Sequence, residues 1–125
     1  MMDKFLWVFL GAGLGGAARY FVSVLIILRY LGPFPLATFS VNIAGSFLIG
    51  IFMTLFTNQY PHHENLRLFL VTGILGGFTT FSSLEWELLQ TARFGARSLA
   101  LFYLASSVAA GYAAVWLGAV LARRP

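Results

Sequence analysis

The sequence contains no cysteine and very few charged residues. Its 125 residues include 8 Lys and Arg, 4 Asp and Glu and 2 His, so that 10% of the residues are charged while 59% are hydrophobic. Without cysteine, disulfide bridges and thiolate metal sites are excluded. With so little charge, the chain cannot coat a water-soluble globule of its size with polar groups. We therefore expect a surface that faces lipid.

The positive net charge does not indicate a protein that binds nucleic acid. The formal charge is +4, but the basic residues stand singly or in pairs at the ends of apolar blocks and form no run or basic face. Positions at the membrane surface account for them. Catalysis is not indicated either, since no nucleophile has a base at a plausible spacing and the adjacent His62 and His63 lack a third metal ligand. We predict no enzyme.

Four long apolar blocks predict an all-α integral membrane protein. Each block reaches the roughly 20 residues that a helix needs to cross the hydrocarbon core. Buried helices of a soluble protein would be shorter and would alternate with amphipathic ones, and the first block exceeds the roughly 7–15 residues of a signal-peptide core. We expect a single domain of four transmembrane helices over residues 1–125. The blocks are Phe5–Leu28, Phe34–Phe56, Leu66–Thr91 and Leu99–Leu121.

The distribution of Lys and Arg hardly favours one orientation in the membrane. Short connections make successive helices antiparallel, so the basic residues divide into two nearly equal groups, which the positive-inside rule cannot separate. We expect insertion in both orientations and pairing as an antiparallel, dual-topology homodimer; the alternative is one orientation fixed by other cues. One group is Lys4, Arg67, Arg123 and Arg124, and the other is Arg29, Arg93 and Arg97.

Small residues form stripes on three of the predicted helices. Such stripes let helix backbones approach closely in membranes. Glycine is common in membrane helices, so a stripe alone is not a specific signal. We expect them to serve packing. The residues are Gly11, Gly15 and Ala18; Gly45 and Gly50; and Ala105, Ala109, Gly111 and Ala114.

Polar residues within the spans are candidates for a permeation pathway, because polar groups in hydrocarbon are costly. Thr38, Asn42 and Ser46 recur every four residues and share one face of the second helix, and Tyr103 and Ser107 have the same spacing in the fourth. Serine and threonine hydroxyls often bond only their own helix. The amide of Asn42 must instead find partners on another helix or on a permeant species.

The third block contains an unusual stretch, Gly73-Ile-Leu-Gly-Gly-Phe-Thr-Thr-Phe-Ser-Ser83. Two adjacent glycines followed by two β-branched threonines favour helix poorly, so we expect a break in the third helix. A broken backbone at membrane depth must be buried or line a cavity, and its carbonyls can bind a cation. The alternative is a glycine-rich packing contact. Phe78 and Phe81 flank the stretch, and the positive edge of a phenylalanine ring can hold a small anion.

Two charged residues also lie within or near the spans. Arg19 is roughly 20 Å along the first helix from Phe5. It lies either at the membrane surface or in an aqueous vestibule. Its glycine and alanine neighbours favour the vestibule. Anions would concentrate near such a cation. Glu87 could line the mouth of a pathway, or it could lie at the membrane surface, as Arg93 does.

Three motifs, on the first three helices in order, resemble those of Fluc/CrcB fluoride channels. They are Gly15-Gly16-Ala17-Ala18-Arg19-Tyr20, Val41-Asn42-Ile43-Ala44-Gly45-Ser46-Phe47 and Gly76-Gly77-Phe78-Thr79-Thr80-Phe81-Ser82-Ser83. The third motif is specific, whereas the first two would be weak alone. The resemblance covers essentially the whole chain.

The resemblance implies a fluoride-selective channel that passively exports fluoride from the cytoplasm. It implies a dual-topology homodimer in a bacterial inner membrane, with two parallel pores and a structural sodium ion at the dimer centre held by the backbone carbonyls of Gly76 and Thr79. Arg19 and Glu87 match vestibule positions. The implied fluoride pathway comprises Thr38, Asn42, Phe81, Leu84, Tyr103 and Ser107.

Two positions depart from the family pattern. Leu84 stands where a second phenylalanine is usual, which removes one aromatic edge from the pathway, and Gly111 stands where a hydroxyl residue is common. An alternative function is a non-conducting membrane assembly subunit, in which the polar faces only join helices. A proton-coupled exporter similar to small multidrug resistance transporters is less well supported, because its first helix would need a deep carboxylate and this one has only Asp3 at its end.

Overall fold

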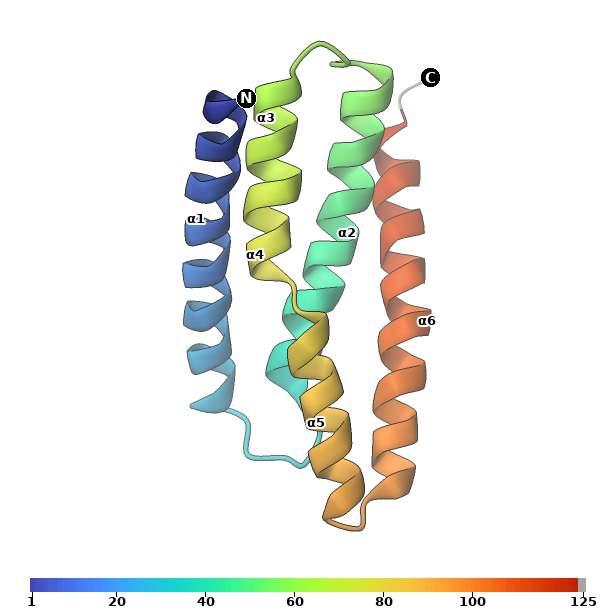
Figure 1. Cartoon of the computed structure of the whole chain (residues 1–125). Coiled ribbons are helices and arrows are strands. Elements are labelled where there is room, and N and C mark those ends of the chain that lie inside the picture. Colours follow the sequence, from blue (N-terminus) through green and yellow to red (C-terminus); the bar gives the residue numbers. More distant parts are fainter. Residues whose placement is uncertain (124–125) are drawn as a thin grey trace.

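The computed structural model describes residues 1–123, which contain only helices and their connections (Figure 1). Helices α3, η1, α4 and α5 follow one another along a single span, Glu64–Arg93. Together with α1, α2 and α6, this span gives four helical segments long and apolar enough to cross a membrane, which confirms that prediction. The elements are α1 (Met2–Ile27), α2 (Leu36–Asn58), α3 (Glu64–Arg67), η1 (Leu68–Leu75), α4 (Gly76–Phe78), α5 (Phe81–Arg93) and α6 (Arg97–Ala122).

The four spans form an elongated bundle in which the start of α1, the end of α6 and the connection between α2 and α3 lie at one end (Figure 1). Helix α1 packs along η1 and α4, while α2 packs along α6. The spans therefore place Lys4, Arg67 and Arg123 at one end and Arg29, Arg93 and Arg97 at the other. Arg124, which belongs to the first basic group, lies outside the described residues.

Glycines set the close approach of α1 to the third span. A Cβ atom added at Gly15 would collide with the Ile74 carbonyl, one at Gly73 would lie 2.8 Å from the Cα of Gly11, and one at Gly77 would collide with the Ala12 carbonyl. Real Cβ atoms are not found so close to a backbone, so only glycine permits this packing.

The contact between α2 and α6 differs in part from the predicted stripes. Gly50 contacts the carbonyl of Val115 as the stripe on α2 predicts, but on α6 the close approach is made by Gly118, which lies against the carbonyl of Phe47. Ala105 and Ala109 are exposed. The face that α6 turns toward α2 near Gly50 carries Gly118, and the packing role of Ala105 and Ala109 stays a prediction.

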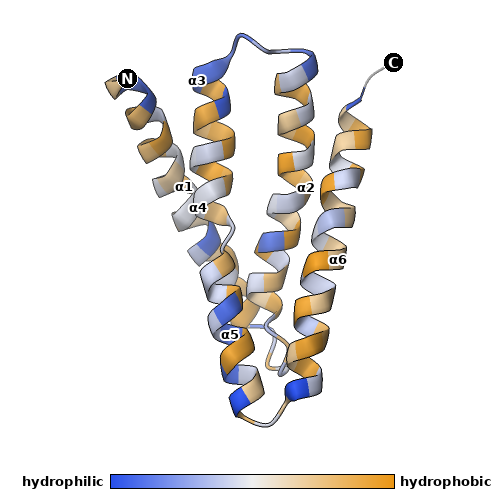
Figure 2. Cartoon of the chain, turned by 45° about the vertical axis from the view of Figure 1, so that its right-hand side comes forward, coloured by the Kyte–Doolittle hydropathy of each residue, from blue (hydrophilic) through white to orange (hydrophobic). Residues whose placement is uncertain are grey.

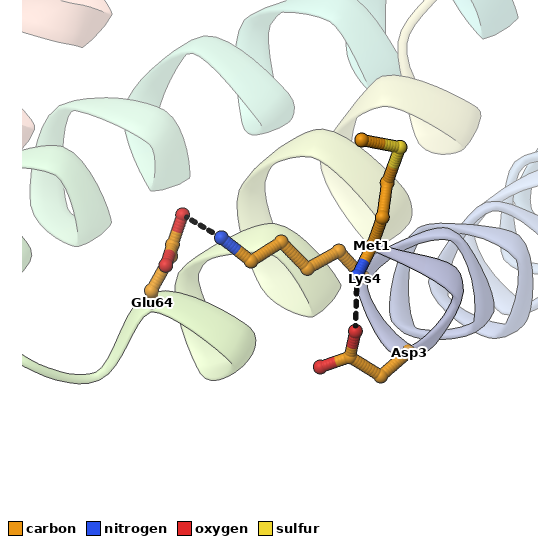
Figure 3. Close-up of polar contacts among 4 residues, drawn as sticks. All are labelled: Met1, Asp3, Lys4 and Glu64. Carbon is orange, nitrogen blue, oxygen red and sulfur yellow. Dashed lines mark hydrogen bonds and ion pairs between the residues drawn. The ribbon is translucent and has the colours of Figure 1, made fainter.

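The eight residues of η1 form a π-helix, where the apolar pattern predicts ordinary α-helix. A π-helix bonds each N–H to the carbonyl five residues back and is therefore wider than an α-helix. Its first residues follow α3, whose Glu64 accepts a hydrogen bond from Lys4 Nζ at 2.8 Å (Figure 3). The N-terminal amino group pairs with Asp3 at 3.1 Å in the same region.

Hydropathy follows the geometry of the bundle. Hydrophobic residues cover most of the length of the helices, and the hydrophilic residues gather at the connections, with further hydrophilic positions within α2 and α5 (Figure 2). Many large apolar side chains are exposed along the helices, such as Phe9, Phe21, Phe102 and Trp116. This surface suits a lipid environment and leaves the polar positions inside the spans to be explained.

Candidate functional site

The third span leaves helical geometry close to its middle. Helix α4 ends at Phe78, Thr79 and Thr80 have extended backbone, and α5 begins at Phe81 (Figure 1). The dihedral angles are φ −87° and ψ 157° at Thr79, and φ −149° and ψ 121° at Thr80. The chain thus exposes peptide groups at a depth where hydrocarbon offers them no partner.

Asn42 on α2 holds this extended segment from the side. The Thr80 N–H donates to Asn42 Oδ1 at 2.8 Å, and Asn42 Nδ2 donates to the Thr80 carbonyl at 2.9 Å. The amide therefore replaces both backbone partners that Thr80 would have in a helix. The Asn42 amide carries two N–H donors, so one of them is left beyond the bond to Thr80.

Thr80 also caps the N-terminus of α5. Its Oγ1 accepts a hydrogen bond from the Ser83 N–H at 3.2 Å and donates to Ser83 Oγ at 3.1 Å. In a continuous α-helix the Thr80 N–H would bond to the Gly76 carbonyl, and the Ser83 N–H would bond to the Thr79 carbonyl. Both donors are engaged elsewhere, so the carbonyls of Gly76 and Thr79 are without their helical partners.

A cavity of about 310 Å³ adjoins this segment. Phe81 borders it while remaining 73% exposed, whereas Leu84 is buried. The cavity therefore combines apolar walls with the backbone of Thr79 and Thr80 and the polar face of α2. Its lining residues are Asn42, Gly45, Ser46, Ile49, Val71, Leu75, Gly76, Thr79, Thr80, Phe81 and Leu84.

Glu87 joins three helices through hydrogen bonds. Its carboxylate accepts from Thr38 Oγ1 at 2.6 Å and from the Tyr103 hydroxyl at 2.7 Å, and both of these residues are buried. Within residues 1–123, Glu87 makes no ion pair with Arg93. Glu87 therefore lies beside two predicted pathway residues, Thr38 and Tyr103.

Ser107 lies one turn beyond Tyr103 on α6. Its Oγ is buried and has no hydrogen-bond partner in the described part of the chain. An unpaired hydroxyl in a membrane span is costly unless a partner from outside the chain reaches it. Ser107 is therefore the predicted pathway residue with the clearest capacity to bind a further species.

Arg19 borders a second cavity, of about 320 Å³, between α1, α2 and the start of α5. The side chain is half-buried and forms no ion pair within residues 1–123. Hydroxyl residues Ser23, Thr38, Thr80 and Ser83 share this cavity with it. A cation surrounded by hydroxyl groups is a suitable environment for an anion.

The structure thus brings the predicted residues into two clusters and adds one residue that sequence reasoning missed. Asn42 meets the extended segment, and Thr38 and Tyr103 meet Glu87. The missed residue is Thr80, which bonds to Asn42 and caps α5. A threonine at the start of a helix is a recognisable capping signal, but its pairing with Asn42, 38 residues away, has no local signal.

Comparison with known proteins identifies relatives over nearly the whole chain. The family described as "CrcB-like protein, Camphor Resistance (CrcB)" matches residues 6–119. A protein of Solibacter usitatus named fluoride-specific ion channel FluC is 48% identical over 97% of this chain and 99% of its own length. Proteins with the same name from Acidobacterium capsulatum and a Methylobacterium species are 44% and 50% identical, covering 97% and 86% of this chain and the same shares of their own lengths.

The extent of these matches confirms the family resemblance that the three motifs indicate. With four spans long and apolar enough to cross a bilayer, the chain is a multi-pass membrane protein. It belongs to the CrcB-like family.

Proposed function

We propose that this protein is a fluoride-selective ion channel that passively exports fluoride from the cytoplasm across a bacterial inner membrane. The observation that carries the proposal is the name shared by relatives that are 44–48% identical over 97% of the chain, fluoride-specific ion channel. The same names describe channels and not enzymes, in agreement with the prediction of no catalysis.

The proposed pathway uses donors that can replace the water around a small anion. Ser107 has an unpartnered hydroxyl, and Asn42 has one N–H beyond the hydrogen bond to Thr80. The hydroxyls of Thr38 and Tyr103 donate to Glu87, so an ion that reaches them competes with this carboxylate. A narrow bore and the weaker bonding of larger halides to such donors would select fluoride.

Phe81 and Leu84 would supply the apolar wall of the pathway. Phe81 is largely exposed in the single chain and adjoins the cavity beside Asn42. The edge of its ring carries partial positive charge, which suits an anion. Leu84 at the same wall provides no such edge.

Passive conduction is sufficient for export. Hydrofluoric acid is weak, so it crosses membranes in the neutral form and ionises in a less acidic cytoplasm. The interior-negative potential then drives the anion outward, with a free-energy change of about 2.3 kcal/mol per charge for each 100 mV. Arg19, in its cavity of hydroxyl residues, would gather anions at the entrance.

The proposed assembly is an antiparallel homodimer with two pores. Two features support it. The basic groups at the two ends of the bundle are nearly equal, and the cavity at mid-span is bordered by the exposed residues Gly76 and Phe81. Polar backbone at this depth has to be covered by protein, and a second copy of the chain would cover it.

A structural sodium ion at the dimer centre fits the residues that are present. The carbonyls of Gly76 and Thr79 have lost their helical donors to Asn42 and Thr80, and carbonyls of unwound helices are suitable ligands for sodium. The ion would be coordinated by carbonyl oxygen atoms from both chains and would hold them together. Replacing sodium by a large organic cation during purification should therefore lower the melting temperature of the dimer, a readout independent of conduction.

Fluoride efflux from liposomes containing the purified protein tests the function directly. With potassium permeability supplied by an ionophore, we expect rapid release of fluoride and retention of chloride, each followed with an ion-selective electrode. A folded dimer that releases neither ion would contradict the channel and favour the non-conducting assembly subunit.

A further inference from the structure

The polar face of α6 ends at Ser107. The next residue one turn along is Gly111, which carries no side chain. A Cβ atom at Gly111 would lie 3.6 Å from Ser46 Oγ and 3.9 Å from Ile43 Cδ1, both ordinary van der Waals distances. The hydroxyl of Ser46, on the neighbouring helix α2, therefore lies over the position where α6 lacks a polar group.

Ser46 continues the polar face of α2 by one turn beyond Asn42 and borders the same cavity as Asn42 and Thr80. Serine and threonine in membrane helices commonly bond a carbonyl of their own helix, as Thr54 does to Gly50 at 2.8 Å. Ser46 makes no such bond, and its hydroxyl has no protein partner within residues 1–123. A half-buried, uncommitted hydroxyl beside a cavity in a membrane span requires a partner of another kind.

We propose that Ser46 is a further residue of the fluoride pathway, and that its hydroxyl binds the anion at the level where α6 presents Gly111. The inference rests on the proposed channel function and extends it. Three adjacent donors with free capacity, Asn42, Ser107 and Ser46, then form a continuous series across the contact between α2 and α6. The pathway crosses at this point from a hydroxyl of α6 to a hydroxyl of α2.

The first test compares fluoride efflux of the wild-type protein and of Ser46→Ala in liposomes. Loss of one hydrogen bond to an ion corresponds to about a tenfold fall in rate. We expect this fall in Ser46→Ala, while the elution volume of its dimer stays unchanged. Thr54→Val is the matched control, because it removes a hydroxyl from the same helix that already bonds its own backbone. Its flux should equal that of the wild type.

The second test moves the hydroxyl to the other helix. There is room for a side chain at position 111, so the double variant Ser46→Ala with Gly111→Ser should recover most of the lost flux. Ser46→Ala with Gly111→Ala fills the same space without a hydroxyl and should not recover it. A purely structural role of Ser46 would make the two double variants alike.

The outcomes separate the two proposals. A folded wild-type dimer that conducts no fluoride overturns the channel function and the role of Ser46 with it. A conducting wild type with undiminished flux in Ser46→Ala, or equal flux in the two double variants, overturns only the role of Ser46.

Discussion

Asn42 combines a structural and a proposed conducting role in one side chain. Its oxygen accepts from the Thr80 N–H, and its nitrogen donates to the Thr80 carbonyl. These bonds use one acceptor and one donor of the amide and leave a second donor. The same group can therefore fix the extended segment of the third span and contribute to the solvation of an anion.

Replacing Asn42 by aspartate tests the conducting role, although it also removes the donor to the Thr80 carbonyl. Asn42→Asp keeps an oxygen for the Thr80 N–H but adds negative charge to the proposed route. Two like charges about 4 Å apart repel by about 4 kcal/mol at an effective dielectric constant of about 20, so we expect fluoride efflux to fall by about a thousandfold. The measurement is efflux from liposomes, with dimer integrity checked by size-exclusion chromatography. Undiminished flux would remove Asn42 from the pathway.

Leu84 allows a test of the aromatic edge that this chain lacks. The residue borders the cavity of about 310 Å³, which offers space for a larger side chain. Leu84→Phe adds a ring whose edge is worth about 0.5–1.5 kcal/mol in favourable contacts, so we expect fluoride flux to rise roughly twofold to tenfold. Leu84→Ile, which changes shape without adding a ring, is the control. Equal flux in all three proteins would show that this edge is not needed.

At the scale of the elements, glycines decide how α1 meets the third span. Gly11 lies so close to η1 that an added Cβ would collide with the Phe69 carbonyl and lie 2.9 Å from Gly73 Cα. Gly13, two residues further along the same helix, is exposed and has no atom within 4 Å of an added Cβ. The two glycines differ only in what they face.

This difference predicts opposite effects of the same substitution. Gly11→Ala should lower the free energy of unfolding by about 1–3 kcal/mol, the usual cost of overpacking. Gly13→Ala should be neutral or raise it by up to about 1 kcal/mol, because alanine favours helix. Thermal unfolding in detergent, followed by circular dichroism, measures both. Equal stability of the two variants would contradict the close packing of α1 on η1.

For the whole molecule, the distribution of charge along the bundle governs insertion. Lys4, Arg67 and Arg123 lie at the end where α1 begins and α6 ends, and Arg29, Arg93 and Arg97 lie at the other. Because neither end clearly dominates, the positive-inside rule allows both orientations. The antiparallel dimer requires both.

Reporter fusions at the C-terminus test this arrangement. The wild-type protein should give signal on both sides of the membrane. The variant with Arg93→Ala and Arg97→Ala leaves only Arg29 at that end of the bundle. The opposite end then carries most of the basic residues, so the C-terminus should remain cytoplasmic. That variant alone should form no conducting dimer, and co-expression with a chain biased the other way should restore flux. A wild-type signal on one side only would refute dual topology.

Much of the fold could be predicted from the apolar runs, because membrane thickness fixes the length of a spanning helix. The glycine and threonine stretch of the third block coincides with the extended residues Thr79 and Thr80, since poor helix formers concentrate there. The faces of α2 and α6 that carry Thr38, Asn42, Tyr103 and Ser107 also follow from spacing alone. These features depend on residues near one another in the chain.

The tertiary structure decided which of these faces meet and what each polar group bonds. Asn42 pairs with Thr80 and Glu87 with Thr38 and Tyr103 because the packing of α2, α5 and α6 brings distant residues into contact. The contact at Gly118 likewise depends on the neighbouring helix α2. The sequence alone determined the spans and their polar faces, because local periodicity and length suffice for them. Hydrogen-bond partners required the rotation and depth of each helix, which only side-chain packing sets.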